Sequence, residues 1–313
     1  MIDTWFGFKR PTARFLHAWA IANVAANVLL VVTGGGVRVT GSGLGCPTWP
    51  QCTSGNIAPV RGNEMGIHSA IEFGNRLLTW VLVAVAVATF VAAVRRRPAD
   101  PLARRLALIV ALGVPLQGVI GGITVLTNLN PWVVSLHFVA TMIIISIATW
   151  LAIHVKPREA TAPSIVDGAE SAPALRRVGM IVAWLMYATT WIAVYFGTVV
   201  TGSGPHSGDD IAMRNGLRFD QMAVLHADAV WTLVGLSVAL IVLTVAAGSS
   251  LKRSALVFGG IVLLQGFIGY LQYVLHVPGG LVILHMFGAA ILMIGATQLV
   301  LATTRTEGSR RTE

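Results

Sequence analysis

The chain has 313 residues, of which 55% are hydrophobic and only 11% are charged, with a mean hydropathy of +0.74. Soluble proteins carry about 25% charged residues, so this composition excludes an ordinary soluble enzyme, and it is the reverse of a disordered chain. The net charge of +9 indicates either a nucleic-acid partner or basic loops that orient a membrane protein.

Eight apolar stretches are long enough to cross a membrane as helices. In hydrocarbon the backbone must satisfy its own hydrogen bonds, so apolar runs of about 20 residues indicate spanning helices. In chain order, the predicted spans are 15–37, 67–94, 106–125, 133–154, 178–200, 221–247, 256–275 and 281–303.

The basic residues gather on one side of these spans. Seventeen of the 22 Lys and Arg residues fall in the termini and in the loops after the second, fourth and sixth spans, whereas four fall in the other loops. Because basic loops stay in the cytoplasm, we predict a multi-pass protein of the plasma membrane with both termini cytoplasmic. The charge then fixes topology, and we expect no nucleic-acid binding.

The two halves of the chain repeat each other. The segment VTGSG at 39–43 recurs at 200–204, and the pattern LQGxIG at 116–121 recurs at 264–269. Each repeat holds an even number of spans, so the halves share one orientation. We predict an all-α membrane protein whose eight transmembrane helices form two tandem, pseudo-symmetric four-helix bundles.

We place the N-terminal half at 1–155 and the C-terminal half at 178–313. The stretch 156–177 between them contains Pro, Ser and Ala and is predicted to be a cytoplasmic linker.

Four histidines stand near the starts of the even-numbered spans, and we predict that they share one depth, about 6 to 9 Å inside each helix. They are His68, His137, His226 and His285. An ionisable residue inside a membrane is a candidate functional residue, and two inward-facing imidazoles in a bundle can hold a haem iron. Interhelical hydrogen bonding is the structural alternative. Metal transport would require ligands at several depths.

The second span carries the one carboxylate and the one guanidinium that lie well inside the apolar stretches. The spacing places Glu72 one turn from His68 and one turn from Arg76 on the same helix face. A structural ion pair between Glu72 and Arg76 is one interpretation. The other is a carboxylate that handles protons or offsets a developing cation beside a bound haem.

Cys46 and Cys52, the only cysteines, lie in a loop predicted to face the oxidising side of the membrane. Their short, proline-containing spacer favours a disulfide. Either a structural staple or thiol–disulfide exchange fits this pair.

Together these features resemble bacterial haem A synthases. The resemblance covers nearly the whole chain and rests on the paired bundles, the VTGSG segment before the cysteines, the segment 71–76 and the later histidines. That family oxidises a methyl group of haem O to the formyl group of haem A for cytochrome oxidase. The resemblance implies that His226 and His285 hold a haem b in the C-terminal half, that His137 binds the substrate haem in the N-terminal half, and that Glu72 is catalytic.

One position departs from the family pattern. Many members have Glu-x-x-His-Arg in the second span, where this chain has Asn75 in place of the histidine. Asparagine is a poor iron ligand, so either His137 holds the substrate iron alone or His68 is the second ligand. An overlay of 65–68 on 222–226 with one gap favours His68.

The rival function is a dihaem b-type membrane electron carrier without substrate oxidation, which accounts for the histidines but not for Glu72. A transporter built from parallel repeats is less favoured because no span is visibly broken. The expected partners are the lipid bilayer, haem O, a haem O synthase that hands the substrate over, and an electron acceptor that the sequence does not identify.

Overall fold

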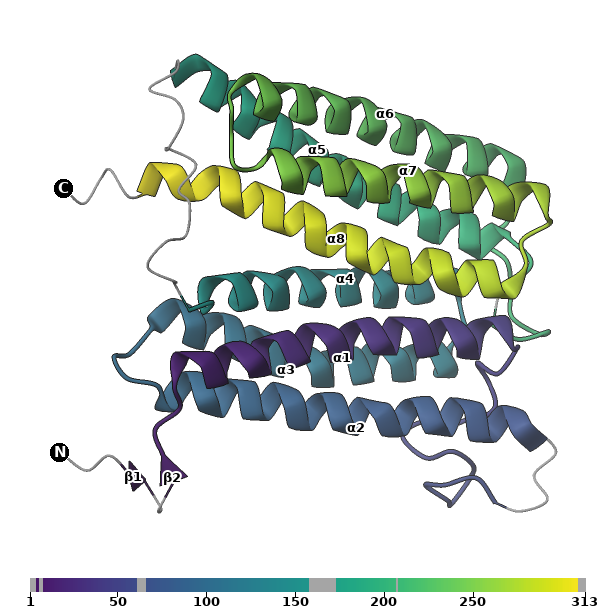
Figure 1. Cartoon of the computed structure of the whole chain (residues 1–313). Helices are drawn as coiled ribbons and strands as arrows, with labels where there is room; N and C mark the ends of the chain where they lie inside the picture. Colours follow the sequence, from purple (N-terminus) through teal and green to yellow (C-terminus); the bar gives the residue numbers. More distant parts are fainter. Residues whose placement is uncertain (1–3, 6–7, 61–65, 158–172, 207, 309–313) are drawn as a thin grey trace. The chain divides into compact units, whose positions relative to one another are not determined.

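A computed structural model describes residues 4–5, 8–60, 66–157, 173–206 and 208–308 (Figure 1). Two short strands, β1 and β2, pair in antiparallel fashion ahead of the first helix. Within the described residues eight helices follow, each long and apolar enough to cross a membrane, so the eight predicted spans are confirmed. The elements are β1 Thr4–Trp5, β2 Phe8–Lys9, α1 Ala13–Val39, α2 Gly66–Arg95, α3 Pro101–Leu126, α4 Pro131–His154, α5 Pro173–Ser203, α6 Phe219–Ala246, α7 Lys252–Val274 and α8 Gly279–Gly308.

The chain divides into two compact units. Unit 1 comprises Met1–Pro157 and His206–Met213, and unit 2 comprises Arg158–Pro205 and Arg214–Glu313. Most of the predicted linker, residues 158–172, lies outside the described residues.

The segment His206–Met213 follows α5 in the chain but belongs to unit 1, whereas the predicted boundaries assign it to the C-terminal half. Its backbone explains the difference, because the Gly43 N–H donates to the Gly208 carbonyl at 2.8 Å. The Arg38 guanidinium also donates to the His206 carbonyl at 2.6 Å. Long-range hydrogen bonds of this kind leave no periodic signal in a sequence.

Each unit is an antiparallel four-helix bundle. In unit 1 the neighbouring pairs are α1 with α2, α2 with α3, α3 with α4, and α4 with α1. Unit 2 repeats this cycle from α5 to α8. The second and fourth helices of each bundle therefore stand diagonally across its core, where inward-facing side chains from the two can meet.

The buried residues of α4 and α8 follow one register. Seven buried positions of α4 recur at the same spacing in α8, which supports the predicted pseudo-symmetry. They are Met142, Ile144, Ile145, Ala148, Thr149, Leu151 and Ala152 in α4, matched by Ala290, Leu292, Met293, Ala296, Thr297, Leu299 and Val300 in α8.

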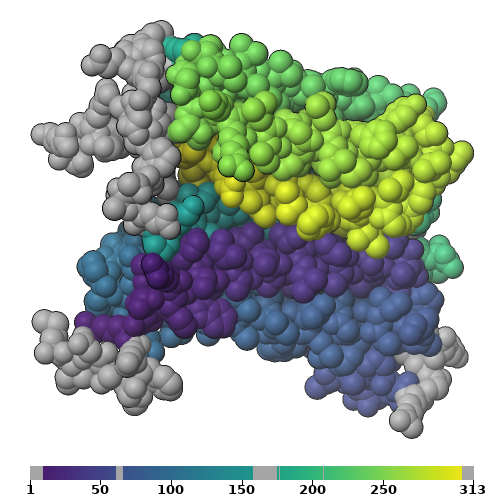
Figure 2. Space-filling model, in the orientation of Figure 1, coloured from purple at the N-terminus to yellow at the C-terminus, as the bar shows by residue number. Residues whose placement is uncertain are grey.

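Large apolar side chains on the outside of the helices match a lipid environment. Trp80 on α2 is 72% exposed, Leu112 on α3 is 62% exposed and Leu263 on α7 is 60% exposed. In water such surfaces would drive association, whereas in a bilayer they face acyl chains. The space-filling view shows α1 (purple) and α2 (blue) packed along each other in unit 1 (Figure 2).

We call the end of a bundle at which its first helix ends and its second begins the loop end.

At the end of unit 1 opposite the loop end, Asp100 caps α3 by accepting from the Ala103 N–H at 2.9 Å. The His154 imidazole donates to the same carboxylate at 2.9 Å, and Arg96 lies 3.8 Å away. Partial burial opposes ionisation, but the bonds from the Ala103 amide and His154 outweigh it and hold the pKa of Asp100 below its ordinary value.

We predict that Asp100→Ala lowers the free energy of unfolding by about 1 kcal/mol at neutral pH, because it removes the cap. Asp100→Asn should keep most of the cap. Because the folded-state pKa is lowered, the ionised carboxylate stabilises the protein fully above the pKa of free aspartate. That contribution is lost as pH falls through the lowered value. In detergent, the Asp100→Ala variant should therefore unfold at a lower temperature than the wild type, and this difference should shrink in acid. A difference that grows in acid would contradict the stabilising role of the ionised Asp100.

Candidate functional site

Two histidines of unit 2 face each other across the core. His226 is the eighth residue of α6 and His285 is the seventh residue of α8, on diagonal helices near the loop end. Their ring centres lie 6.2 Å apart, and the rings are inclined at 80°. An imidazole nitrogen lies about 2 Å from a metal ion that it ligates, so two rings on opposite sides of one ion have centres about 6 Å apart. The observed spacing fits one ion between the two rings.

The hydrogen bonds of these rings also suit a ligand role. His226 Nδ1 donates to the Ala193 carbonyl of α5 at 3.0 Å, which leaves the lone pair on Nε2. The Nδ1 atom of His285 is buried without a hydrogen-bond partner among the described residues. A buried polar atom without a partner is unfavourable, and a ligand at this ring would account for the burial of the imidazole.

A glycine lies against each of the two imidazole rings. A Cβ added at Gly197 would lie 3.3 Å from His226 Cε1, and one added at Gly269 would lie 3.5 Å from His285 Cε1. Across the described residues, no three His, Cys, Asp or Glu side chains converge on one point. A metal ion held by this pair must therefore bring most of its own ligands, as iron does in a porphyrin.

His137 of unit 1 has the same setting as His285. It is the seventh residue of α4, its Cε1 would lie 3.3 Å from a Cβ at Gly121, and its Nδ1 is also buried without a partner among the described residues. Gln117 of α3 donates to the His137 carbonyl at 3.3 Å. His137 and His285 therefore have matching surroundings in the two units.

His68 does not share this depth. Because α2 begins at Gly66, His68 is its third residue, and its Nδ1 lies 2.8 Å from the Ser42 hydroxyl, beyond the end of α1. Counted from the start of each helix, His137, His226 and His285 are the seventh or eighth residue, whereas His68 is only the third, so His68 does not share the position predicted for all four. The gapped overlay aligned residues near the start of α2, and the segments that precede α2 and α6 differ in length.

The buried residues of α2 and α6 give the register directly. Four buried positions of α2 recur at the same spacing in α6, and in this register Asn75 matches His226. The matched pairs are Leu82 with Leu233, Ala86 with Ser237, Thr89 with Leu240, and Ala93 with Thr244. His226 therefore corresponds to Asn75 and not to His68, the residue that the gapped sequence alignment favoured.

Glu72 and Arg76 form the predicted ion pair on α2, and both also bind the cysteine loop. Glu72 is 5% exposed, and its Oε2 accepts from the Cys46 N–H at 2.6 Å. Arg76 donates to the carbonyls of Cys46, Thr48 and Gln51 at 2.9 to 3.1 Å. The two charges therefore fasten the loop to α2, a role that sequence spacing does not reveal.

Cys46 and Cys52 form the predicted disulfide. The loop lies close against its neighbours, because a Cβ at Gly45 would come 2.3 Å from the His68 carbonyl oxygen. A Cβ at Gly122 would come 2.4 Å from the Trp49 indole, so a glycine is needed at both contacts. The disulfide thus closes a loop that covers the loop end of unit 1 beside Glu72.

A buried amide cluster that the sequence pattern did not predict lies deeper between α1 and α2. Asn27 donates to Asn23 Oδ1 at 2.9 Å, and Asn23 donates to Thr89 at 3.4 Å. These side chains satisfy one another, as polar groups in hydrocarbon must, and they tie α1 to α2.

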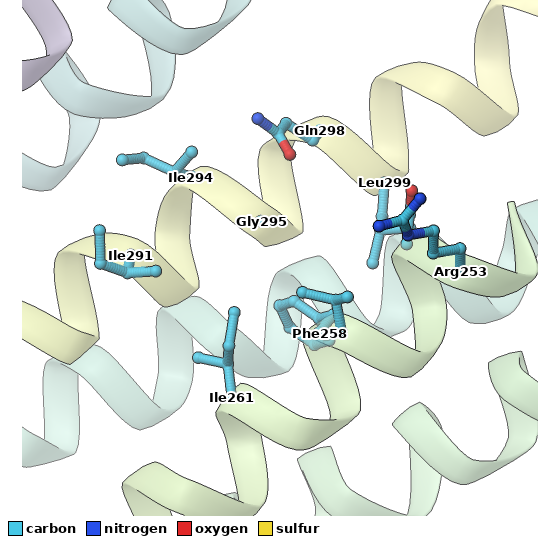
Figure 3. Close-up of a pocket in the computed structure, with 10 residues that line it drawn as sticks. Arg253, Phe258, Ile261, Ile291, Ile294, Gly295, Gln298 and Leu299 are labelled. Atoms are coloured by element: carbon cyan, nitrogen blue, oxygen red, sulfur yellow. The ribbon is translucent and has the colours of Figure 1, made fainter.

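Unit 2 also holds a cleft of about 250 Å³ between α7 and α8 (Figure 3). It lies toward the start of α7 and the end of α8, away from His285. Arg253 is the charged residue in its wall. The lining is otherwise mainly apolar: Ser254, Val257, Phe258, Ile261, Ile291, Ile294, Gly295, Gln298 and Leu299.

Comparison with known proteins gives the family. The family model COX15-CtaA, described as cytochrome oxidase assembly protein, matches residues 17–297, which include every site residue above. This chain belongs to the COX15-CtaA family.

Several relatives carry the name haem A synthase. The chain is 30% identical to that of Symbiobacterium thermophilum over 192 residues, covering 60% of each protein. It is 29% identical to that of Listeria monocytogenes over 194 residues, covering 60% of this chain and 59% of the relative. The haem A synthase of Geobacillus thermodenitrificans is 34% identical over 164 residues, covering 50% of this chain and 49% of its own. The matched segments thus span 60% or less of these relatives.

In this member of the COX15-CtaA family, we predict that Arg76→Gln lowers the free energy of unfolding by about 3 kcal/mol, because it leaves Glu72 buried without its counter-charge. Hydrogen exchange of residues 45–52 should accelerate, because three carbonyls of the loop lose their donor. The double variant Glu72→Gln/Arg76→Gln should lose less stability than the two single variants summed. Strictly additive losses would contradict the coupling of the two side chains.

Proposed function

We propose that this protein is a haem A synthase, which oxidises a methyl group of haem O to the formyl group of haem A for cytochrome oxidase biogenesis. The observation that carries the proposal is the His226–His285 pair, whose 6.2 Å spacing suits one porphyrin iron, in a chain of the COX15-CtaA family. The relatives named haem A synthase suggest the activity, and the family resemblance implies haem O as the substrate.

The proposed cofactor is a haem b held by His226 and His285, and the proposed substrate site is in unit 1 at His137. When bound, haem b would supply one-electron transfer away from the substrate to an acceptor in or at the membrane. The protein positions the ligands: Ala193 orients His226, and Gly197 and Gly269 leave room beside the two rings.

The conversion of the methyl group to the formyl group is a four-electron oxidation that leaves one oxygen atom on the carbon. It proceeds through the alcohol to a gem-diol, which loses water to give the aldehyde. Glu72 is the carboxylate of unit 1 that we assign to take protons or to offset a developing cation. Its bonds to Cys46 and Arg76 hold it at the loop end of the bundle.

We propose that both termini are cytoplasmic and that the protein lies in the plasma membrane. The distribution of basic residues supports this orientation, and so does the Cys46–Cys52 disulfide, because disulfides persist on the oxidising side of a membrane. A haem O synthase in the same membrane is the proposed source of the substrate.

We predict that Glu72→Gln leaves haem bound but abolishes haem A formation, with haem O or its alcohol accumulating. Glutamine keeps an oxygen for the Cys46 N–H, so the loop should stay in place. Pigments extracted from membranes and separated by chromatography give the readout. Asp228→Asn is the matched control, since it makes the same chemical change at an exposed position of α6. A normal haem A yield in Glu72→Gln would refute the assignment.

We predict that His226→Ala or His285→Ala removes the absorption band of a low-spin haem with two histidine ligands. His154→Ala, which changes a histidine paired with Asp100 instead, should leave that band intact. Absorption spectra of the reduced purified proteins decide this, and an unchanged spectrum in His285→Ala would exclude the haem b site. If wild-type protein contained haem b but never yielded haem A, the electron-carrier function would replace the synthase.

A further inference from the structure

The second and fourth helices of the two bundles carry different pairs of residues at equivalent positions. When α4 and α8 are aligned by their buried positions, His137 corresponds to His285. When α2 and α6 are aligned in the same way, Asn75 corresponds to His226. Unit 2 therefore presents two imidazoles across its diagonal, whereas unit 1 presents one imidazole and one amide. Helix register carries this comparison, because buried positions must face the core in both bundles.

The contacts of the two matched residues agree with this register. His226 bonds to Ala193 in α5, the first helix of its bundle, and Asn75 bonds to Thr33 in α1, the first helix of the other. The Thr33 hydroxyl donates to Asn75 Oδ1 at 2.7 Å. This bond engages the amide oxygen, and the amide nitrogen has no lone pair to give to a metal. Asn75 therefore lies opposite His137 without being an iron ligand.

His68 cannot take the place of the missing imidazole without a change in α2. It lies seven residues before Asn75, so it stands about 10 Å nearer the loop end along the helix. Its Nδ1 is bonded to Ser42, and its backbone carbonyl packs against Gly45 of the disulfide loop. These contacts hold the first turn of α2, and His68 with it, nearer the loop end than Asn75 is.

We infer that the substrate haem iron in unit 1 is ligated by His137 alone, and that its second axial position is open and faces Asn75. The inference rests on the proposed function and deepens it. The two haems then differ in kind: the iron between His226 and His285 has both axial positions filled. The iron at His137 can accept a small neutral ligand, with the Asn75 amide N–H groups available to donate a hydrogen bond to it.

Carbon monoxide is the probe, because it binds reduced haem iron only where an axial position is free. The protein is purified from cells that supply haem O, its haems are quantified by extraction, and spectra of the reduced form are recorded with and without carbon monoxide. We expect wild-type protein to bind one carbon monoxide for each haem held in unit 1 and none at the haem of unit 2. The unchanged low-spin band of unit 2 reports that each variant is folded.

Three variants separate the candidate ligands. Asn75→His should abolish carbon monoxide binding and add a second low-spin signal, because it restores the imidazole pair. His68→Ala should bind carbon monoxide as the wild type does. His137→Ala should lose the haem of unit 1 while keeping that of unit 2.

The inference is overturned if the haem of unit 1 does not bind carbon monoxide in the wild type and begins to bind it in His68→Ala. Such a result would leave the proposed function intact, because haem A formation is measured separately by extraction. A protein that held no haem in unit 1, even with haem O supplied, would overturn both.

Discussion

In a bilayer, each polar group inside the chain has to find its partner within the protein, because neither water nor lipid tails can replace it. This constraint produces the eight helices, whose backbone bonds are internal, and it governs the few polar side chains that enter them. Asn23, Asn27 and Thr89 bond to one another, and Glu72 is matched by Arg76 and a backbone N–H. The Nδ1 atoms of His137 and His285 are the departures that bear on function, because both are buried without a partner among the described residues.

The charges of unit 1 serve a structural purpose and, under the proposed function, a chemical one. Arg76 neutralises Glu72 and also binds three carbonyls of the disulfide loop, so the loop and the carboxylate hold each other in place. An ion pair buried in this way is held by its geometry rather than by net Coulomb energy, since desolvation offsets most of the attraction. A carboxylate so fixed is a defined acceptor beside the proposed substrate site.

The comparison of the two bundles separates what duplication preserved from what it changed. The packing positions of α2 and α6 and of α4 and α8 remain in register, and so do the glycines that face His137 and His285. The loops changed, because the disulfide lies in unit 1 and has no counterpart after α5. The residue across the bundle from His137 or His285 differs as well, because it is Asn75 in unit 1 and His226 in unit 2. Under the proposed function this difference gives one haem for electron transfer and one for oxidation.

The sequence by itself determined the number of spans, the duplication, the cysteine pair and the adjacency of Glu72 and Arg76. Each of these depends on hydropathy, internal repetition or one helical turn, all of which are local in the chain. Tertiary structure decided which residue of α2 stands opposite His137, because the segments ahead of α2 and α6 differ in length and shift any count made along the sequence. Only the tertiary structure shows that the ring centres of His226 and His285 lie 6.2 Å apart and that Arg76 binds the disulfide loop. Distances across a bundle depend on how helices pack, and a one-dimensional pattern does not contain them.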